Sequence, residues 1–427
     1  MANEKRPLVT VVMPCRNAQG SVGRALRSLL DEWSIKSCEF LIVDGGSTDR
    51  TRQEVEELRN PPSPPFNKGG YSSPPSPPFN NAGFSSPPQT PVYKEGLGAN
   101  QLPPVVKEGL GASPLPPFAK GGAGGDFLND DVLWFAASRG TWVREAREGD
   151  RYDWNPPVGG RRRPVIRVID NPFHVAARGL NIGILEARGA YIARADAEVT
   201  YAPGYLRRCV ELLERKEAAN AGGIEVPVAG RGRLGQALAL AVRHPLGGRP
   251  AKPEYSGYAE KAESGTYRRK LFDEIGLFDA KSRGDEASEM NVRIVLAGRK
   301  IWVDGGLKVF REVPPTLGAL AGRHFRLGRG RARTAKKHRA LTSWRQIAAP
   351  LLVAMMGFSI VRSFKAPLHL LFFAAYAASM LAAALAGPAP EDPGGPVFET
   401  RVVAAAALMT MHVAWGAGFL WGLAADW

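Results

Sequence analysis

The sequence predicts an α/β fold on a mostly parallel central sheet, with a disordered insertion and C-terminal transmembrane helices. Three observations predict it. Apolar strands alternate with amphipathic helices on both sides of the insertion. Residues 60–126 hold 16 of the 35 prolines of the chain. Long apolar stretches occupy most of the chain after residue 346.

The first 59 residues alternate strand and helix patterns. Residues 9–13 (VTVVM) form a continuous apolar run, which predicts a strand buried on both faces. Ser21 stands where it can cap a helix. The apolar stripe of that helix comprises Val22, Ala25, Leu26, Leu29, Leu30 and Trp33. Residues 40–43 predict a second strand and residues 51–58 a second helix, so we expect a parallel, right-handed arrangement.

The pattern stops in residues 60–126, where near-copies recur, such as SPPFNKGG at 63–70 and SPPFNNAG at 76–83. This composition buries too little apolar surface to offset the entropy of ordering, so we expect a disordered insertion. The irregular spacing argues against a solenoid. A polyproline ligand is the alternative. Of residues 127–164 we expect only a short helix near 132–137.

The α/β pattern resumes at residue 165. VIRVID (165–170) predicts a strand, 176–186 a helix, 190–195 a strand and 203–217 an amphipathic helix. Because the same scheme continues, the insertion interrupts one domain. Its first part is residues 7–59 and its second part residues 165–312.

Three apolar stretches follow, at residues 346–361, 366–387 and 402–423. The second and third approach the roughly 20 residues that a spanning helix needs. The shorter first stretch is expected to lie at the membrane surface. An acidic loop, 388–401, would then be external and both chain ends cytoplasmic. Three full spans, or a soluble helical bundle, are the alternatives for residues 346–424.

The charge balance points to a membrane partner. The chain carries 56 Lys and Arg against 41 Asp and Glu, a net charge of +15. Residues 313–390 contain no Asp or Glu, and residues 313–345 are rich in Arg and Lys. Cations directly before apolar spans are typical of a cytoplasmic membrane flank, so we expect a basic amphipathic interface segment at 313–345 and no nucleic-acid partner.

Two features favour a cytoplasmic catalytic domain at the inner membrane. The polar start MANEKRP is unlike a secretory signal. The three cysteines, Cys15, Cys38 and Cys209, have no CxxC spacing. We expect them to be reduced and packed.

Polar residues follow three of the predicted strands: 14–17 (PCRN), 44–49 (DGGSTD) and 196–198 (DAE). In a parallel sheet these segments meet at one rim, where ligands bind. Asp44 is suited to accept hydrogen bonds from a base or ribose, and Gly46 lets the backbone approach a ligand. Asp196 and Glu198 are hard oxygen ligands that suit Mg²⁺ or Mn²⁺ bridging a diphosphate.

Several of these segments together resemble a known family. VVMPCRNAQGSVGRALRSLL, followed by EFLIVDGGSTDRT, resembles the family 2 glycosyltransferases of the GT-A fold. VIDNPFHVAARGLNIGILEARGAYIARADAEVTYAPGYLRRCVELLE and HFRLGRGRARTAKKH resemble the bacterial succinoglycan-type glucosyltransferases. The resemblance covers residues 7–59 and about 165–361.

The resemblance implies roles for particular residues. Those expected around the nucleotide-sugar are Pro14, Arg16, Asn17, Asp44, Gly46, Asp49, Arg194 and Asp196. Asp196 and Glu198 stand at the family's metal motif and would hold Mg²⁺ or Mn²⁺. Those expected to meet diphosphate at the membrane interface are Arg326, Arg329 and Arg331.

Residues 283–294 (RGDEASEMNVRI) depart from the family pattern. Relatives carry two aspartates, one of them the catalytic base, where this chain has Ala287 and Ser288. In one interpretation Glu286 or Asp285 is the base, and in the other the enzyme is weakened or inactive. The plainer expectations are that Asp285 caps a helix and that Glu289 pairs with a residue four positions on, Arg293.

The resemblance therefore implies a membrane-attached, inverting glycosyltransferase. Its donor would be a UDP-sugar, with glucose as the sugar. Its acceptor would be a polyprenyl-diphosphate-linked saccharide on the cytoplasmic leaflet, for exopolysaccharide or another envelope glycan. The alternatives are a catalytically degenerate membrane scaffold or binding protein, and a synthase that also extrudes its product.

Overall fold

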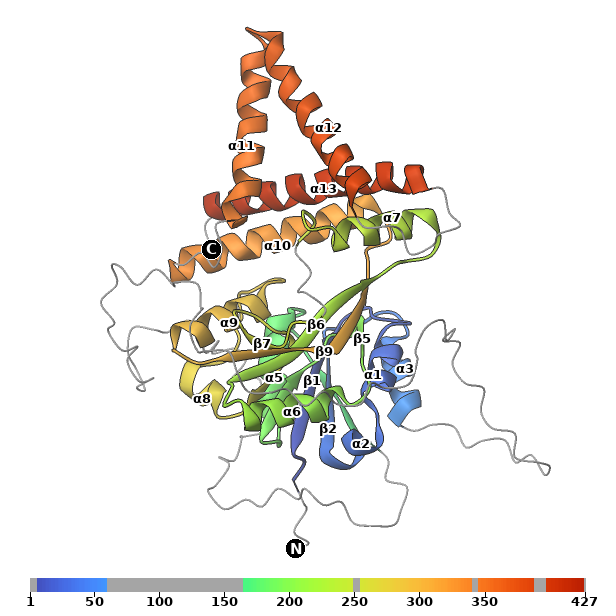
Figure 1. The fold of residues 1–427 in the computed structure, drawn as a ribbon. Coiled ribbons are helices and arrows are strands. Elements are labelled where there is room, and N and C mark those ends of the chain that lie inside the picture. The colour runs from blue at the N-terminus through green and yellow to red at the C-terminus, as the bar shows by residue number, and fades with distance from the viewer. Residues whose placement is uncertain (1–5, 60–163, 249–253, 340–344, 388–396, 426–427) are drawn as a thin grey trace, which may run out of the picture. The chain divides into compact units, whose positions relative to one another are not determined.

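The computed structural model describes residues 6–59, 164–248, 254–339, 345–387 and 397–425. These residues form one mixed β-sheet with helices on both faces, followed by a group of C-terminal helices (Figure 1). The predicted insertion at 60–126, the predicted helix near 132–137 and most of the loop at 388–401 lie outside the described residues.

The first part of the domain is close to the prediction, with one break. Its elements are β1 (Val9–Cys15), α1 (Val22–Leu29), α2 (Glu32–Ser37), β2 (Cys38–Asp44) and α3 (Thr51–Arg59). The apolar stripe predicted to run on to Trp33 is divided between α1 and α2. Asp31 causes the division, because its carboxylate accepts the backbone N–H of Ser34 at 2.7 Å and caps a new helix. The Ser21 hydroxyl donates to the carbonyl of Ala18 at 3.0 Å, so its predicted capping role is wrong.

The second part contains the predicted elements and several that the sequence did not indicate. The predicted ones are β3 (Val165–Asp170), α5 (Ala176–Glu186), β4 (Tyr191–Arg194) and α6 (Tyr205–Arg215). The helix expected after Asp285 is α9 (Glu286–Leu296). The others are β5 (Val199–Tyr201), β6 (Asn220–Val228), α7 (Gly232–Arg243), β7 (Gly257–Ala259), β8 (Glu263–Arg268), α8 (Leu271–Ile275) and β9 (Ile301–Glu312).

The described strands form one nine-stranded sheet in the order β3-β2-β1-β4-β8-β6-β9-β5, with β7 also paired to β9. Strands β3, β2, β1 and β4 are parallel, as predicted. β8 is antiparallel to both its neighbours, so the sheet is mixed beyond β4. Cys15 pairs with Asp44 and Asp44 with Asp170, which places the ends of three strands at one rim.

Alternate residues of the strands enter two different cores. Val9, Val11 and Met13 of β1 pack with α1 and α6 on one face of the sheet. Val12 packs with α5, α8 and α9 on the other face. This arrangement confirms a strand buried on both faces. The three cysteines are buried and free, as expected.

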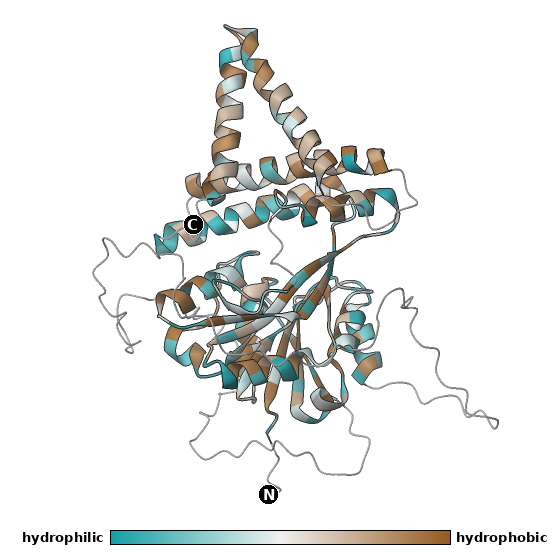
Figure 2. Cartoon of the chain, viewed as in Figure 1, coloured by the Kyte–Doolittle hydropathy of each residue, from teal (hydrophilic) through white to brown (hydrophobic). Residues whose placement is uncertain are grey.

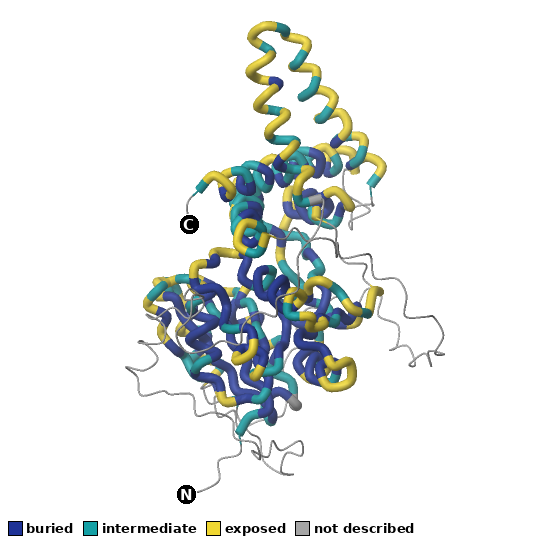
Figure 3. The backbone as a smooth tube through the Cα atoms, turned by 90° about the vertical axis from the view of Figure 1, so that its left-hand side faces the viewer, coloured by how far each residue is buried: buried dark blue, intermediate teal, exposed yellow. Residues whose placement is uncertain are grey.

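The C-terminal region consists of helices. They are α10 (Leu317–His338), α11 (Arg345–Ser363), the 3₁₀ helix η1 (Pro367–Leu370), α12 (Leu371–Ala386) and α13 (Val397–Ala424). Within the described residues, three segments are long and apolar enough to cross a membrane: Gln346–Ser363, Pro367–Ala386 and Val397–Ala424. The first was expected to be too short, but its helix extends past the apolar run to Ser363. Figures 2 and 3 show that α11 and α12 are largely apolar and exposed.

Candidate active site

The carboxylate at the end of β2 is already engaged. Asp44 accepts the hydroxyl of Ser47 at 2.5 Å and the backbone N–H of Ser47 at 3.1 Å. Arg52 of α3 bridges Asp44 and Asp170, the last residues of two adjacent strands. Asp44 is buried, whereas the Asp170 side chain is 62% exposed. The rim therefore presents an aspartate and an arginine in addition to the predicted Asp44.

Asn17 and Asp49, both expected at the nucleotide, hold two loops together. The side-chain oxygen of Asn17 accepts the backbone N–H of Thr48 at 2.9 Å, and the backbone N–H of Asn17 donates to the hydroxyl of Ser47 at 2.9 Å. Asp49 accepts the backbone N–H of Gln19 at 3.0 Å. These bonds join the loop after β1 to the loop after β2, so Asn17 and Asp49 hold the two loops of the rim in place.

The local structure requires a glycine at position 46, whether or not a ligand binds there. Its φ is +74°, a region that favours glycine, and a Cβ there would lie 2.9 Å from the ring of His174. The His174 Nδ1 contacts the carbonyl of Gly45 at 2.6 Å. The His174 ring thus lies close to this glycine, and the approach of a ligand to Gly46 stays a prediction. Pro14 is part of β1, and Arg16 is exposed beside Gly45 at the same rim.

The predicted metal motif lies within a network of arginines. The two Asp196 carboxylate oxygens pair with Arg194 at 2.7 Å and with Arg311 of β9 at 2.8 Å. Arg311 also pairs with Glu225 of β6 at 2.8 Å and lies 3.7 Å from Glu198. Arg323 of α10 extends the network to Glu225 at 3.3 Å. Three strands, the loop between β4 and β5, and one helix therefore contribute side chains to the centre around Asp196.

The arginines keep Asp196 ionised. Burial opposes the charged form, but Arg194 and Arg311 outweigh it and hold the pKa of the Asp196 carboxyl below its usual value. Because each carboxylate oxygen has two lone pairs, Asp196 retains acceptor capacity beside its arginines. Its anionic oxygens are of the kind that Mg²⁺ and Mn²⁺ prefer.

Glu198 is the more accessible of the two expected metal ligands, with 78% of its side chain exposed. Among the described residues, no group of three or more His, Cys, Asp and Glu side chains converges on one point. The two carboxylates thus fit a divalent ion in charge and ligand type, provided that a diphosphate completes its coordination.

Asp285 and Glu286, the candidate bases, point to different neighbours. Asp285 precedes α9, but its side chain turns to α10 and accepts the hydroxyl of Thr334 at 3.1 Å, so its expected capping role is wrong. Burial raises the pKa of Asp285 to about 6, although Arg331 at 3.7 Å opposes the rise. Glu286 is buried, accepts the N–H of Gly284 at 2.8 Å, and its charge contributes to raising the pKa of Arg194. Glu286 therefore interacts electrostatically with Arg194, the partner of Asp196.

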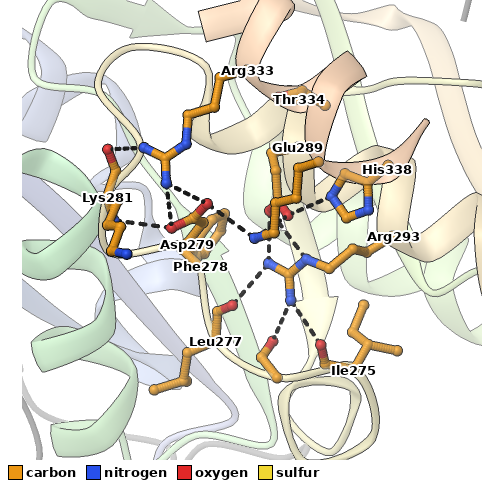
Figure 4. Close-up of polar contacts among 12 residues, drawn as sticks. Ile275, Leu277, Phe278, Asp279, Lys281, Glu289, Arg293, Arg333, Thr334 and His338 are labelled. Carbon is orange, nitrogen blue, oxygen red and sulfur yellow. Dashed lines mark hydrogen bonds and ion pairs between the residues drawn. The ribbon is translucent and has the colours of Figure 1, made fainter. Parts of the chain in front are cut away.

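The third acid of this stretch, Glu289, forms a buried cluster with α10 (Figure 4). Its predicted pairing with Arg293 is confirmed at 2.9 Å, with side chains only 2% and 7% exposed. It also contacts His338 at 2.8 Å and Lys337 at 3.3 Å. Asp279 pairs with Lys337 at 3.0 Å and with Arg333 at 3.2 Å. The cluster fastens α10 against α9.

The arginines expected to meet diphosphate are dispersed along α10. Arg331 faces Asp285, and its side chain is 17% exposed. The backbone of Arg329 packs against Gly422 of α13. Arg326 is exposed. Of the three, the structure places Arg331 beside the acidic start of α9.

Comparison with known proteins identifies this arrangement. Residues 10–68 and 160–276 match the family described as glycosyl transferase family 2. The succinoglycan biosynthesis protein ExoA of Rhizobium meliloti (strain 1021) is 30% identical over 266 residues, which cover 60% of this chain and 77% of that protein. The chain belongs to glycosyltransferase family 2. The expected GT-A-like fold is thereby confirmed for this family 2 glycosyltransferase.

Solved structures of other glycosyltransferases align more distantly. The mannosyltransferase PcManGT from Pyrobaculum calidifontis, in complex with GDP-Man and Mn²⁺, has 15% identity and a TM-score of 0.46, over 98% of this chain and 88% of that chain. TarS 1–349 of S. aureus, in complex with UDP-GlcNAc, has 11% identity and a TM-score of 0.41, over 97% and 90%. At these scores the likeness carries no argument about donor or metal in this chain.

Sequence reasoning missed Arg311, Glu225 and Arg52 as members of this glycosyltransferase site. Glu225 is the one charged residue of β6 (NAGGIEVPV), and a lone charge in such a strand is a usable signal. Arg311 gave no such signal, because β9 also contains Asp304, Lys308 and Glu312. Arg52 carried no such signal, because it begins an ordinary polar helix.

Proposed function

We propose that this family 2 glycosyltransferase transfers glucose from UDP-glucose, with inversion, to a polyprenyl-diphosphate-linked saccharide at the cytoplasmic face of the inner membrane. The product would serve exopolysaccharide synthesis, as the name of the relative from Rhizobium meliloti suggests. The observation that supports the proposal is the buried carboxylate of Glu286, which interacts electrostatically with Arg194 of the Asp196 centre. Asp196 follows the end of β4, and ligands bind at strand ends in such sheets.

The donor would lie along this rim. Asp44, Asp170 and Arg52 would contact the base and ribose. Arg194 and Arg311 would face the diphosphate and stabilise the negative charge that develops on it. Asp196 and Glu198 would hold Mg²⁺ or Mn²⁺, which when bound offsets the same charge.

Glu286 would act as general base in a single displacement. The acceptor hydroxyl attacks the anomeric carbon, the bond from that carbon to the diphosphate oxygen breaks, and the hydroxyl proton passes to the Glu286 carboxylate. UDP leaves with the electron pair of the broken bond. Attack from the face opposite the leaving group inverts the anomeric carbon. Glu286 thus takes the role of the aspartate that relatives carry at the position of Ala287.

The test is release of UDP by the purified full chain with lipid-linked acceptors. UDP-glucose should be turned over, and Glu286→Gln should lower kcat by at least about 10²-fold, the usual contribution of a general base. Glu274→Gln is the matched control, because Glu274 pairs with Arg299 near the surface, at 2.7 Å. Turnover that survives in Glu286→Gln would place the base elsewhere.

A second candidate is a catalytically degenerate scaffold that binds a nucleotide-sugar, and Ala287 in place of the expected aspartate favours it. If no common donor is turned over and Ala287→Asp creates activity from near zero, the scaffold is the better description. If the natural chain is active and Ala287→Asp changes it by only a few fold, the scaffold is excluded.

A further inference from the structure

The helix α13 is apolar and 28 residues long, about 42 Å, so on composition it ranks with α11 and α12 as a membrane span. Its packing differs from theirs. In its most apolar 18-residue window 44% of the residues are buried, against 11% in each of the other two helices. The residues that bury α13 indicate whether it crosses the bilayer or lies along its surface.

α13 contacts α7, the residues just after it, and α10 along its length. Near its start, Glu399 reaches Arg233 of α7 at 3.4 Å. At its middle, the His412 Nε2 donates to the carbonyl of Leu246, just beyond α7, at 2.8 Å. Near its end, Gly422 lies so close to α10 that a Cβ would be 2.8 Å from Ala332. A helix that crossed the membrane would touch a domain on one side only near one end.

The partner of the second half of α13 cannot enter the bilayer. α10 runs beside it, since Gly328 of α10 packs on the backbone of Trp415 and Gly418 of α13 packs on the backbone of Phe325. α10 carries seven Arg and Lys residues and holds α9 through Asp285 and Glu289. Each Arg or Lys at the bilayer centre costs about 2.5–3.5 kcal/mol. Helices paired over several turns share one direction, so α13 runs with α10.

The hairpin of α11 and α12 has the opposite character. It exposes large apolar residues on both helices, among them Leu351, Phe358 and Leu371, which are 56–63% exposed. Nineteen and twenty residues give helices of about 28–30 Å, which matches the hydrocarbon core. The charged residues Arg362 and Lys365 lie at its turn, where they would reach the far interface.

We propose that α11 and α12 form a two-span hairpin in the lipid bilayer, whereas α13 lies along the near surface between that hairpin and α10. The outward face of α13 includes Trp421, which is 60% exposed and of a type enriched at membrane interfaces. The turn at residues 363–367 is then external. Residues 388–396 then stay on the catalytic side, which differs from the external loop expected from the sequence. The C-terminus stays on the catalytic side, as the sequence predicts.

The test is labelling of single introduced cysteines in cells with a membrane-impermeant maleimide. The native cysteines are buried, so background labelling is low. Lys365→Cys should react in intact cells, whereas Asp392→Cys and a cysteine appended after Trp427 should react only after permeabilisation. Reaction of the C-terminal cysteine in intact cells would establish three spans and overturn the proposal. Protection of Lys365→Cys in intact cells would overturn it equally.

A pair of glycine variants gives an independent measurement. Gly418→Ala would place a Cβ against the Phe325 backbone, whereas a Cβ at Gly357 of α11 meets nothing within 4 Å. We expect Gly418→Ala to lower the melting temperature by several degrees and Gly357→Ala to leave it unchanged. Equal melting of the two variants would contradict the packing of α13 on α10.

The inference rests on the membrane attachment in the proposed function. Different results would refute the attachment and the topology. Recovery of the chain in the soluble fraction would refute attachment. A different labelling pattern in the membrane fraction would refute only the topology.

Discussion

Neutralising Glu289 should destabilise the protein without acting on the chemistry. Glu289 is 2% exposed and pairs with Arg293, Lys337 and His338. Burial opposes its charge, but His338 and Arg293, with Lys337, overcome it and lower the pKa of Glu289 from 4.5 to about 2. At 1.36 kcal/mol per pKa unit, the cluster favours the ionised form by about 3 kcal/mol. Glu289→Gln forfeits this stabilisation.

The consequence is measurable as a shift in melting temperature. For a domain of this size 1 kcal/mol corresponds to about 2–4 °C, so we expect Glu289→Gln to melt about 6–12 °C lower at pH 7. The control is Glu56→Gln, which removes a surface pair with Arg59 at 3.2 Å whose side chains are nearly half exposed. Such pairs contribute at most about 1 kcal/mol.

The pH dependence has a definite sign. The folded pKa of Glu289 is depressed, so its stabilisation is complete above about pH 5 and is lost as pH falls from there towards 2. The gap in melting temperature between Glu289→Gln and the natural protein should therefore be smaller at pH 4 than at pH 7. Equal melting of Glu289→Gln and Glu56→Gln at pH 7, or a gap that widens on acidification, would refute the reasoning.

Three further outcomes are expected. Asp285→Asn should stabilise the protein by up to about 3 kcal/mol at pH 8 and have no effect below about pH 4, because burial raises the folded pKa of Asp285 from 3.8 to about 6; melting curves at both pH values test this. Arg311→Gln should remove one of the two arginines that pair with Asp196 and with Glu225, lower stability by about 1.5–3 kcal/mol and weaken UDP binding in calorimetry, whereas Arg24→Gln at an exposed pair should do neither. Deletion of residues 61–126 should leave melting nearly unchanged, because each halving of a loop alters closure by only about 0.6 kcal/mol; aggregation of the deletion variant would contradict this.

Sequence reasoning located the parallel half of the sheet well. The strands β1, β2, β3 and β4 are short continuous apolar runs, and α5 was predicted at its observed bounds. Such runs are decisive because a strand buried on both faces tolerates few polar residues. Length and apolarity also located two of the three helices that are long and apolar enough to cross a membrane, whereas the apolar run of α11 is shorter than its helix.

The antiparallel half was missed for identifiable reasons. β6 reads NAGGIEVPV, in which two glycines and a proline conceal the strand pattern. A glycine is needed at position 223 because a Cβ there would clash with the carbonyl oxygen of Leu307 in the neighbouring strand β9. This contact exists only in the assembled sheet. Arg311 was missed as a site residue for the same reason. It reaches Asp196 through the pairing of β5 with β9, and these strands are more than a hundred residues apart in the sequence.

The position of β1 in the sheet has a consequence for synthesis of the chain. β1 pairs with β2 nearby and with β4 far along the sequence, and its core contains α6. At about 5–20 residues per second, translation of the roughly 100 residues between α3 and β3 takes on the order of 5–20 s. During this interval β1 and β2 have been made but lack the strands and helices that cover them. We expect residues 7–59 of stalled nascent chains to resist protease only after α6 has left the ribosome, so the insertion sets how long this apolar surface depends on chaperones.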